Sequence, residues 1–156
     1  WRRHRARISG LALIDTKAES DAPEAAQNRI KLAATIREHG VEALLKTPPK
    51  WLREGAAQWP ALKELIRAQK AEAVAQASVA MAGRPDSTLD LATIDVPTAV
   101  IVGEADAITP LANSRAMADA IPHASLSVIP DAAHLSNLEA PEAFEHAMRA
   151  WLRRLS

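Results

Sequence analysis

The stretch TAVIVGEADAITPLANSRAMADAIPHASLSVIPDAAH, residues 98–134, decides the fold class of this chain. It contains two short apolar runs, TAVIV (98–102) and LSVI (126–129), on either side of a helical pattern at 110–121. Continuous apolar runs bounded by Gly, Pro or Asp are typical of strands that are buried on both faces, as in a parallel sheet covered by helices. The stretch therefore predicts a strand, a helix and a second parallel strand, which is the repeating unit of an α/β fold.

Two further patterns extend this unit along the chain. The run LALID (11–15) predicts a third parallel strand. The stretch that opens at Pro141 has the apolar spacing of an amphipathic helix, with Phe144 and Trp151 on one face. Three parallel strands cannot form a finished doubly wound sheet, because such sheets need both faces covered and their edges protected. We therefore expect further strands of the sheet to precede Trp1.

The middle of the chain has a different character. Residues 22–88 contain no strand-like run and are rich in alanine, and we expect one long helix there from Pro60 to Gly83. Since this helical stretch separates two strands of one sheet, it is an insertion into the sheet domain. The expected organisation is a sheet domain formed by residues 1–21 and 89–156, with an all-helical cap, or lid, at 22–88.

The composition argues against several classes of function. The chain has 19 basic and 19 acidic residues, so its formal net charge is zero and no global field favours nucleic acid. No apolar run approaches the roughly 20 residues that span a bilayer, and no secretory signal pattern is present. We expect a cytoplasmic protein with no nucleic-acid or membrane partner. Cysteine is absent and no histidine pair has a metal-ligand spacing, so we expect no metal and no cofactor.

A family resemblance rests on two stretches. The sequence VPTAVIVGEADAITPLANSRAMADAIPHASLSVIPDAAHLSNLEAPEAFEHAMRAWL (96–152) resembles the C-terminal end of the α/β-hydrolases, most closely the branch of 3-oxoadipate enol-lactonases and related esterases. ISGLALIDTKAES (8–20) resembles the strand that follows the helix bearing that family's nucleophile. The resemblance implies the C-terminal part of an α/β-hydrolase sheet with a helical cap insertion. It also implies a small-molecule carboxylic ester or lactone as substrate, cleaved by acyl transfer.

The resemblance also assigns an acid and a base. In this family the triad acid lies just after the penultimate strand and the histidine just after the last, and Asp106 in GEADAITP and His134 in DAAHLSNLE match these positions. A carboxylate bonded to one imidazole nitrogen fixes the tautomer and leaves the other nitrogen free to take the nucleophile's proton. Glu104 is the alternative acid, although its place directly after Gly103 is more typical of a surface charge.

The loop before the histidine departs from the family's pattern. The residue at that position is commonly glycine in the family, but here it is Ala133. The loop must therefore avoid a backbone conformation that only glycine tolerates.

A larger departure concerns the nucleophile. In this fold it sits in a sharp G-x-S-x-G elbow, and no two of the five glycines are four residues apart. Three serines fit the role of nucleophile poorly. Ser87 lies in a turn, Ser114 lies within a helix, and Ser136 lies only two residues after His134. We therefore expect the nucleophile to lie outside this chain, which alone should be inactive. A missing N-terminal half or a second subunit is expected to cover the open sheet edge.

The substrate and the reaction leave alternatives open. Ile108 and Leu135, close beside the expected acid and base, are the predicted substrate-binding residues. An aspartate nucleophile upstream would instead give a dehalogenase-type hydrolase, and a hydrolase-like scaffold without any nucleophile would be a non-catalytic module that binds a small molecule or a partner. A receiver-like or nucleotide-binding domain would use Glu104 and Asp106, but the sequence has no Gly-rich phosphate loop and no suitable lysine after a strand.

Overall fold

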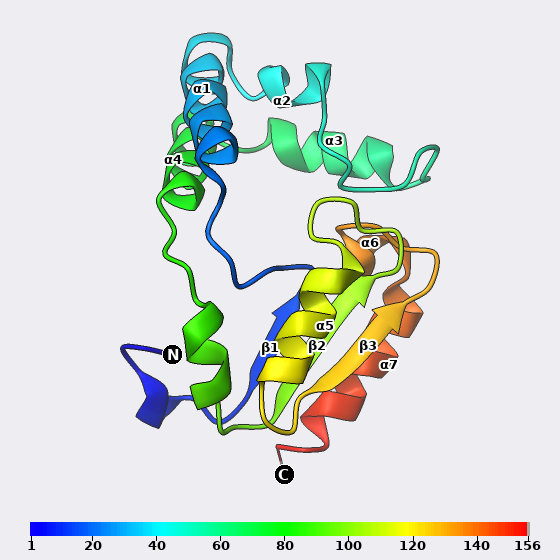
Figure 1. The fold of residues 1–156 in the computed structure, drawn as a ribbon. Coiled ribbons are helices and arrows are strands. Elements are labelled where there is room, and N and C mark those ends of the chain that lie inside the picture. Colours follow the sequence, from blue (N-terminus) through cyan, green and yellow to red (C-terminus); the bar gives the residue numbers. More distant parts are fainter. Residues whose placement is uncertain (156) are drawn as a thin grey trace. The chain divides into compact units, whose positions relative to one another are not determined.

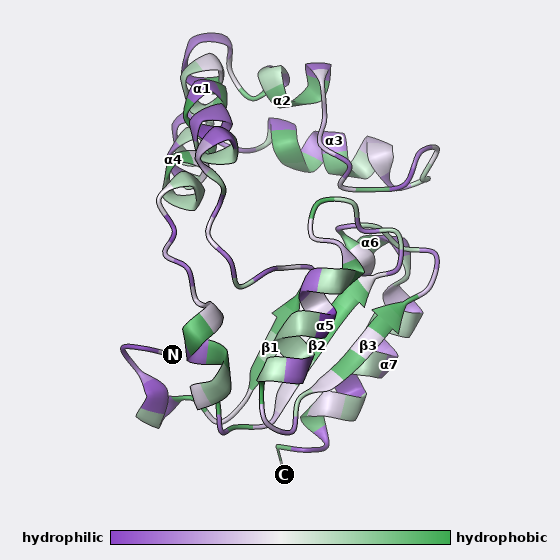
Figure 2. Cartoon of the chain, in the orientation of Figure 1, coloured by the Kyte–Doolittle hydropathy of each residue, from purple (hydrophilic) through white to green (hydrophobic). Residues whose placement is uncertain are grey.

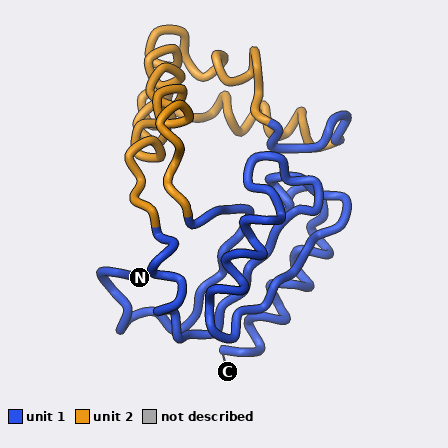
Figure 3. The backbone as a smooth tube through the Cα atoms, viewed as in Figure 1, with its two compact units in different colours: residues 1–18, 50–56, 87–156 blue, residues 19–49, 57–86 orange. Residues whose placement is uncertain are grey.

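The computed structural model describes residues 1–155, and their contacts divide the chain into two compact units (Figures 1 and 3). Unit 1 comprises Trp1–Ala18, Lys50–Ala56 and the chain from Ser87 onward, and unit 2 comprises Glu19–Pro49 and Ala57–Asp86. Residues 50–56, which we expected within the helical insertion, thus group with the sheet. None of the helices in the described part of the chain is long and apolar enough to cross a membrane.

The sheet of unit 1 has three parallel strands in the order β1-β2-β3 (Figure 1). They are β1 (Leu11–Ile14), β2 (Thr98–Gly103) and β3 (Ser125–Ile129). Leu11 lies opposite Thr98, and Ala99 lies opposite Ser125. Every residue of the central strand β2 is buried, as its apolar run predicts. The predicted α/β class and all three predicted strands are confirmed.

Helices cover both faces of this sheet. On one face Val100 packs with Met117 of α5 (Leu111–Ala120) and Leu91 of the 3-10 helix η2 (Thr88–Thr93). On the other face Ile101 packs with Ala147 of α7 (Pro141–Leu152), and the predicted apolar face of α7 joins this cluster. Figure 2 shows β1 and most of β2 in the green of apolar residues, whereas β3 is apolar mainly towards its end. Two further short elements of unit 1 are η1 (Arg5–Arg7) and α6 (Ser136–Glu139).

Unit 2 is entirely helical. It contains α1 (Pro23–His39), α2 (Glu42–Lys46), α3 (Trp59–Arg67) and α4 (Ala71–Ala82). Helices α1 and α4 pack side by side (Figure 1), with Ala33, Ile36 and Ala75 buried. The hydroxyl of Ser78 on α4 also donates to the backbone oxygen of Arg29 on α1 at 3.0 Å.

The expectation of one helix from Pro60 to Gly83 is wrong, because the chain breaks between α3 and α4. The break falls in the polar run RAQK (67–70), where Lys70 is extended with ψ 126°. The side-chain amide of Gln69 donates to the backbone oxygen of Leu65 at 2.9 Å. It thereby satisfies one of the carbonyl groups that a helix end leaves open.

The outer strand β1 pairs with β2 alone within the described chain, so its other edge is unpaired. A hollow of about 530 Å³ lies against β1, on the face of the sheet that carries Leu11 and Leu13. Its apolar lining includes Leu11, Leu13, Leu91 and Met117. Unpaired strand edges and apolar hollows are surfaces that proteins normally cover.

Candidate active site

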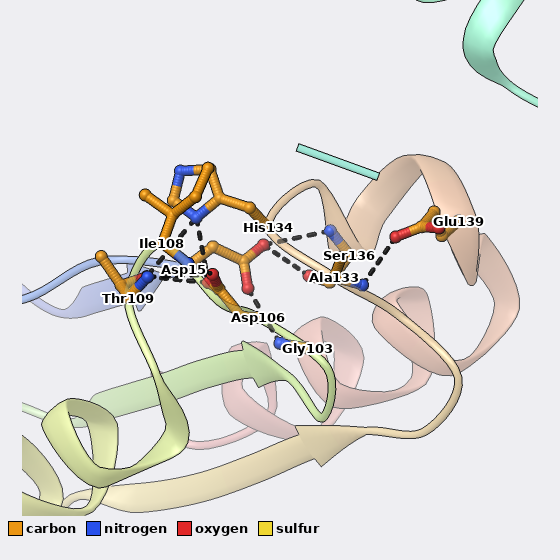
Figure 4. A network of polar contacts seen from close by, with 9 residues as sticks. All are labelled: Asp15, Gly103, Asp106, Ile108, Thr109, Ala133, His134, Ser136 and Glu139. Carbon is orange, nitrogen blue, oxygen red and sulfur yellow. Dashed lines mark hydrogen bonds and ion pairs between the residues drawn. The ribbon is translucent and has the colours of Figure 1, made fainter. Parts of the chain in front are cut away.

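Three polar side chains follow the three strands at the same end of the sheet. Asp15 comes directly after β1, Asp106 follows the end of β2, and His134 lies in the loop after β3. Because parallel strands have their carboxyl ends at one edge, the three loops meet there, and Figure 4 shows their side chains together.

The predicted acid and base are in direct contact. The Nδ1 atom of His134 lies 2.9 Å from Oδ2 of Asp106. The Asp106 side chain is completely buried, whereas that of His134 keeps 21% of its surface exposed. The second ring nitrogen points away from the carboxylate (Figure 4). The predicted geometry of this pair, on the loops after adjacent parallel strands, is confirmed.

Four donors surround the Asp106 carboxylate. Oδ1 accepts from the backbone N–H groups of Ile108 at 2.8 Å and Thr109 at 2.9 Å, and Oδ2 accepts from the Thr109 hydroxyl at 2.8 Å as well as from His134. Burial raises the pKa of Asp106, but the hydrogen bonds from His134, Thr109 and Ile108 outweigh it and hold the pKa below the usual 3.8. At neutral pH Asp106 is therefore a carboxylate that accepts the Nδ1 proton, so in the neutral tautomer of the ring Nε2 carries no proton and can accept one.

Thr109 was not predicted as part of this cluster. A threonine before a proline and a helix usually signals a helix cap, but α5 begins at Leu111 and no side chain caps it. The Thr109 hydroxyl instead donates a hydrogen bond to the buried carboxylate of Asp106.

Gly103, the last residue of β2, lets the two loops approach each other. A β-carbon at this position would lie 2.1 Å from the backbone oxygen of Ala133 and 2.5 Å from that of Ala132. Ala105 also donates its N–H to the Ala132 oxygen at 2.8 Å. Any side chain at residue 103 would thus push the backbone next to His134 away from the Asp106 loop.

The loop before His134 adopts its shape without a glycine. Its left-handed residue is Asp131, with φ 52°, and Ala133 is not among the residues with positive φ. Aspartate tolerates this conformation better than most residues. The departure from the family's usual glycine is therefore compatible with the contact between His134 and Asp106.

Two carboxylates, the partly buried Asp15 and the buried side chain of Glu139, hold the backbone of the His134 loop, and sequence reasoning missed both (Figure 4). Asp15 accepts from the backbone N–H of Ser136, and Glu139 accepts from the N–H of Ala133 at 2.6 Å. The side chain of Glu139 is 1% exposed. The general rule that polar residues at the carboxyl ends of parallel strands meet at one edge applies to Asp15 as well as to Asp106, and could have found it.

The other predicted residues fall in different environments. Ile108 lies beside the His134 ring in Figure 4, and Ile108 and Leu135 are both partly buried. Glu104 is exposed, so the choice of Asp106 over Glu104 as the partner of His134 is confirmed. Ser114 and Ser136 are fully buried.

Parallel strands flanked by helices, with a buried aspartate bonded to a histidine at their carboxyl ends, define an α/β protein of the hydrolase type. The model of the alpha/beta hydrolase family matches residues 2–147, and the chain belongs to this family.

The relatives include lactonases and esterases. The chain is 31% identical to 3-oxoadipate enol-lactonase 2 of Acinetobacter baylyi, over 96% of this chain and 57% of the relative. Among solved structures it resembles a thermophilic esterase from Thermogutta terrifontis, with 39% identity and a TM-score of 0.88 over 99% of this chain and 59% of that one. It also resembles the enol-lactonase from Burkholderia xenovorans LB400, with 30% identity and a TM-score of 0.82 over 97% and 58% of the two chains. The chain thus spans less than two thirds of the length of these relatives.

Proposed function

We propose that this chain supplies the acid, Asp106, and the general base, His134, of a serine-type hydrolase that cleaves a carboxylic ester or a lactone by acyl transfer. The observation that carries the proposal is the 2.9 Å contact between a fully buried Asp106 carboxylate and Nδ1 of a partly exposed His134. This contact holds the imidazole in the tautomer that a general base requires.

The chemistry of the pair follows from this tautomer. Nε2 of His134 takes the proton from the nucleophile's hydroxyl as that oxygen attacks the acyl carbon. The Asp106 carboxylate stabilises the imidazolium that forms, and the imidazolium then protonates the leaving alkoxide. In the second half of the reaction Nε2 takes a proton from the water that attacks the acyl-enzyme, and the imidazolium then returns this proton to the nucleophile's oxygen as the carboxylic acid is released.

The nucleophile and the oxyanion donors belong, in this proposal, to an N-terminal segment outside the 156 residues. Three observations support it. The sequence holds no G-x-S-x-G elbow. The relatives are longer, since the chain covers 57% to 59% of those compared above. The outer edge of β1 is unpaired within the described chain, and a further strand would cover it; a separate apolar hollow lies against one face of the same strand.

The substrate's acyl group would lie against Ile108 and Leu135 in this proposal. Both side chains are partly buried; Leu135 directly follows His134, and Ile108 lies two residues after Asp106, to whose Oδ1 its backbone N–H donates. Apolar walls with a few polar groups are typical of sites for small molecules. A small or medium ester or lactone is therefore the proposed substrate class.

Assaying the whole protein, meaning this chain with the N-terminal segment that the proposal requires, tests the function. We expect it to hydrolyse p-nitrophenyl acetate or a small lactone, whereas residues 1–156 alone should act no faster than free imidazole, because a base without a nucleophile offers little beyond solution catalysis. Halide release from a haloalkane without ester turnover would instead indicate an aspartate nucleophile. Absence of any turnover by the whole protein would favour a non-catalytic module.

A further inference from the structure

Asp15 joins the ends of all three strands. It directly follows β1, and its own N–H donates to the Ile101 oxygen on β2 at 2.9 Å. Its Oδ1 accepts from the N–H of Gly103, the last residue of β2, at 2.9 Å. Its Oδ2 accepts from the N–H of Ser136 at 3.1 Å and from the Ser136 hydroxyl at 2.7 Å, in the segment after β3 (Figure 4).

The two partners of this carboxylate border the acid and the base. Gly103 lies three residues before Asp106, and Ser136 lies two residues after His134. Gly103 and Ser136 are both buried, so their N–H groups depend on Asp15 rather than on water. One carboxylate thus fixes the backbone on both sides of the contact between Asp106 and His134.

The backbone of Asp15 adopts an uncommon conformation. Its φ is 42°, in the left-handed region that non-glycine residues seldom adopt. Burial raises the pKa of Asp15 above the usual 3.8, against the hydrogen bonds from Ser136 and Gly103, which favour the ionised form. Keeping a partly buried carboxylate ionised at this position costs stability, and such perturbed groups are typical of functional sites.

We propose that Asp15 is a positioning residue, which holds the loops of Asp106 and His134 in register through Gly103 and Ser136 and touches neither the substrate nor the reacting atoms. This proposal rests on the proposed function for its kinetic consequences. The acid and the base must be positioned to within a fraction of an ångström, since a misplacement of about 1 Å can lower the rate roughly 100-fold.

Asp15→Asn in the whole protein is the principal test. An asparagine has one acceptor oxygen, so it cannot accept from both the Gly103 and the Ser136 N–H groups as the two carboxylate oxygens do. We expect kcat for p-nitrophenyl acetate to fall about 10- to 100-fold with little change in KM, because the loops lose register and not substrate contacts. The Nδ1 proton resonance of His134, observed in protein labelled with ¹⁵N-histidine, should shift and exchange faster with water.

Ser136→Ala is the graded second variant. It removes only the bond from the hydroxyl to Oδ2 and leaves the bond from the backbone N–H in place. We expect a smaller loss of kcat than for Asp15→Asn and a smaller shift of the His134 resonance. If Asp15→Asn does not fold, the Ser136→Ala protein is used to test the proposal.

Asp21→Asn is the matched control for lost stability. Asp21 is a buried carboxylate of unit 2 that pairs with Arg29, and its side chain is 2% exposed. Its replacement should lower Tm while leaving kcat and the His134 resonance unchanged.

Three results would overturn the positioning role. The first is a folded Asp15→Asn protein with unchanged kcat and an unchanged His134 resonance. The second applies if Asp15→Asn does not fold, and is a Ser136→Ala protein in which both quantities are unchanged. The third is a loss of kcat in Asp21→Asn that matches the loss in Asp15→Asn. If the unaltered whole protein has no hydrolase activity, the proposed function fails, while the His134 resonance still decides the role of Asp15.

Discussion

His134→Ala is expected to lower the ester turnover of the whole protein by several orders of magnitude, roughly 10⁴- to 10⁶-fold. The imidazole is the partner of a fully buried Asp106 carboxylate and keeps its second nitrogen free (Figure 4). Without it, the nucleophile's hydroxyl keeps its proton at neutral pH, and the leaving alkoxide has no proton donor. Steady-state kinetics with p-nitrophenyl acetate measure the effect.

His146→Ala is the control for this substitution. His146 is exposed on α7, where alanine is a good helix former, so turnover should stay within about twofold. His123 serves less well, because its φ of 60° would strain an alanine. Turnover by His134→Ala that equals that of the unaltered protein would show that the base lies elsewhere.

Asp106→Asn is expected to lower kcat by roughly 10⁴-fold while leaving the fold intact. The backbone N–H groups of Ile108 and Thr109 hold one carboxylate oxygen, and an asparagine keeps its carbonyl oxygen there. Its amide N–H₂ then faces Nδ1 of His134 and donates to it, so the ring carries its proton on Nε2. In that tautomer Nε2 cannot accept the nucleophile's proton.

Glu104→Gln is the matched control for Asp106→Asn. Glu104 is the exposed carboxylate two residues earlier in the same loop, and its replacement should change kcat by less than about twofold. A large loss in Glu104→Gln with little loss in Asp106→Asn would reverse the assignment of the acid.

The sequence was informative where a pattern depends on burial or on position along a strand. Apolar runs predicted all three strands, although β2 alone is buried throughout and β1 and β3 are mostly partly buried. Asp106 and His134 were assigned through the resemblance to the α/β-hydrolases, and the rule that the carboxyl ends of parallel strands share one edge agrees with that assignment. The same rule was not applied to Asp15, and the acidic residue after β1 was therefore overlooked.

Other features depend on contacts that no local pattern encodes. In the sequence Glu139 resembles an ordinary helix residue. Only the structure shows that its carboxylate accepts hydrogen bonds from the backbone N–H groups of Ala133 and Arg53. Thr109 has the local signature of a helix cap, but the buried carboxylate of Asp106 competes for its hydroxyl. The break between α3 and α4 was missed because good helix formers lie on both sides of it, Leu, Lys and Glu in α3 and alanine in α4.

Covalent labelling of the whole protein with a fluorophosphonate, followed by peptide mapping, tests the central claim most directly. The claim is that these residues supply base and acid to a serine that lies outside them. The predicted result is one adduct on the serine of a G-x-S-x-G sequence outside residues 1–156, with labelling that is strongly slowed in His134→Ala. An adduct on Ser87, Ser114 or Ser136, or ester turnover without any serine adduct, would contradict the account.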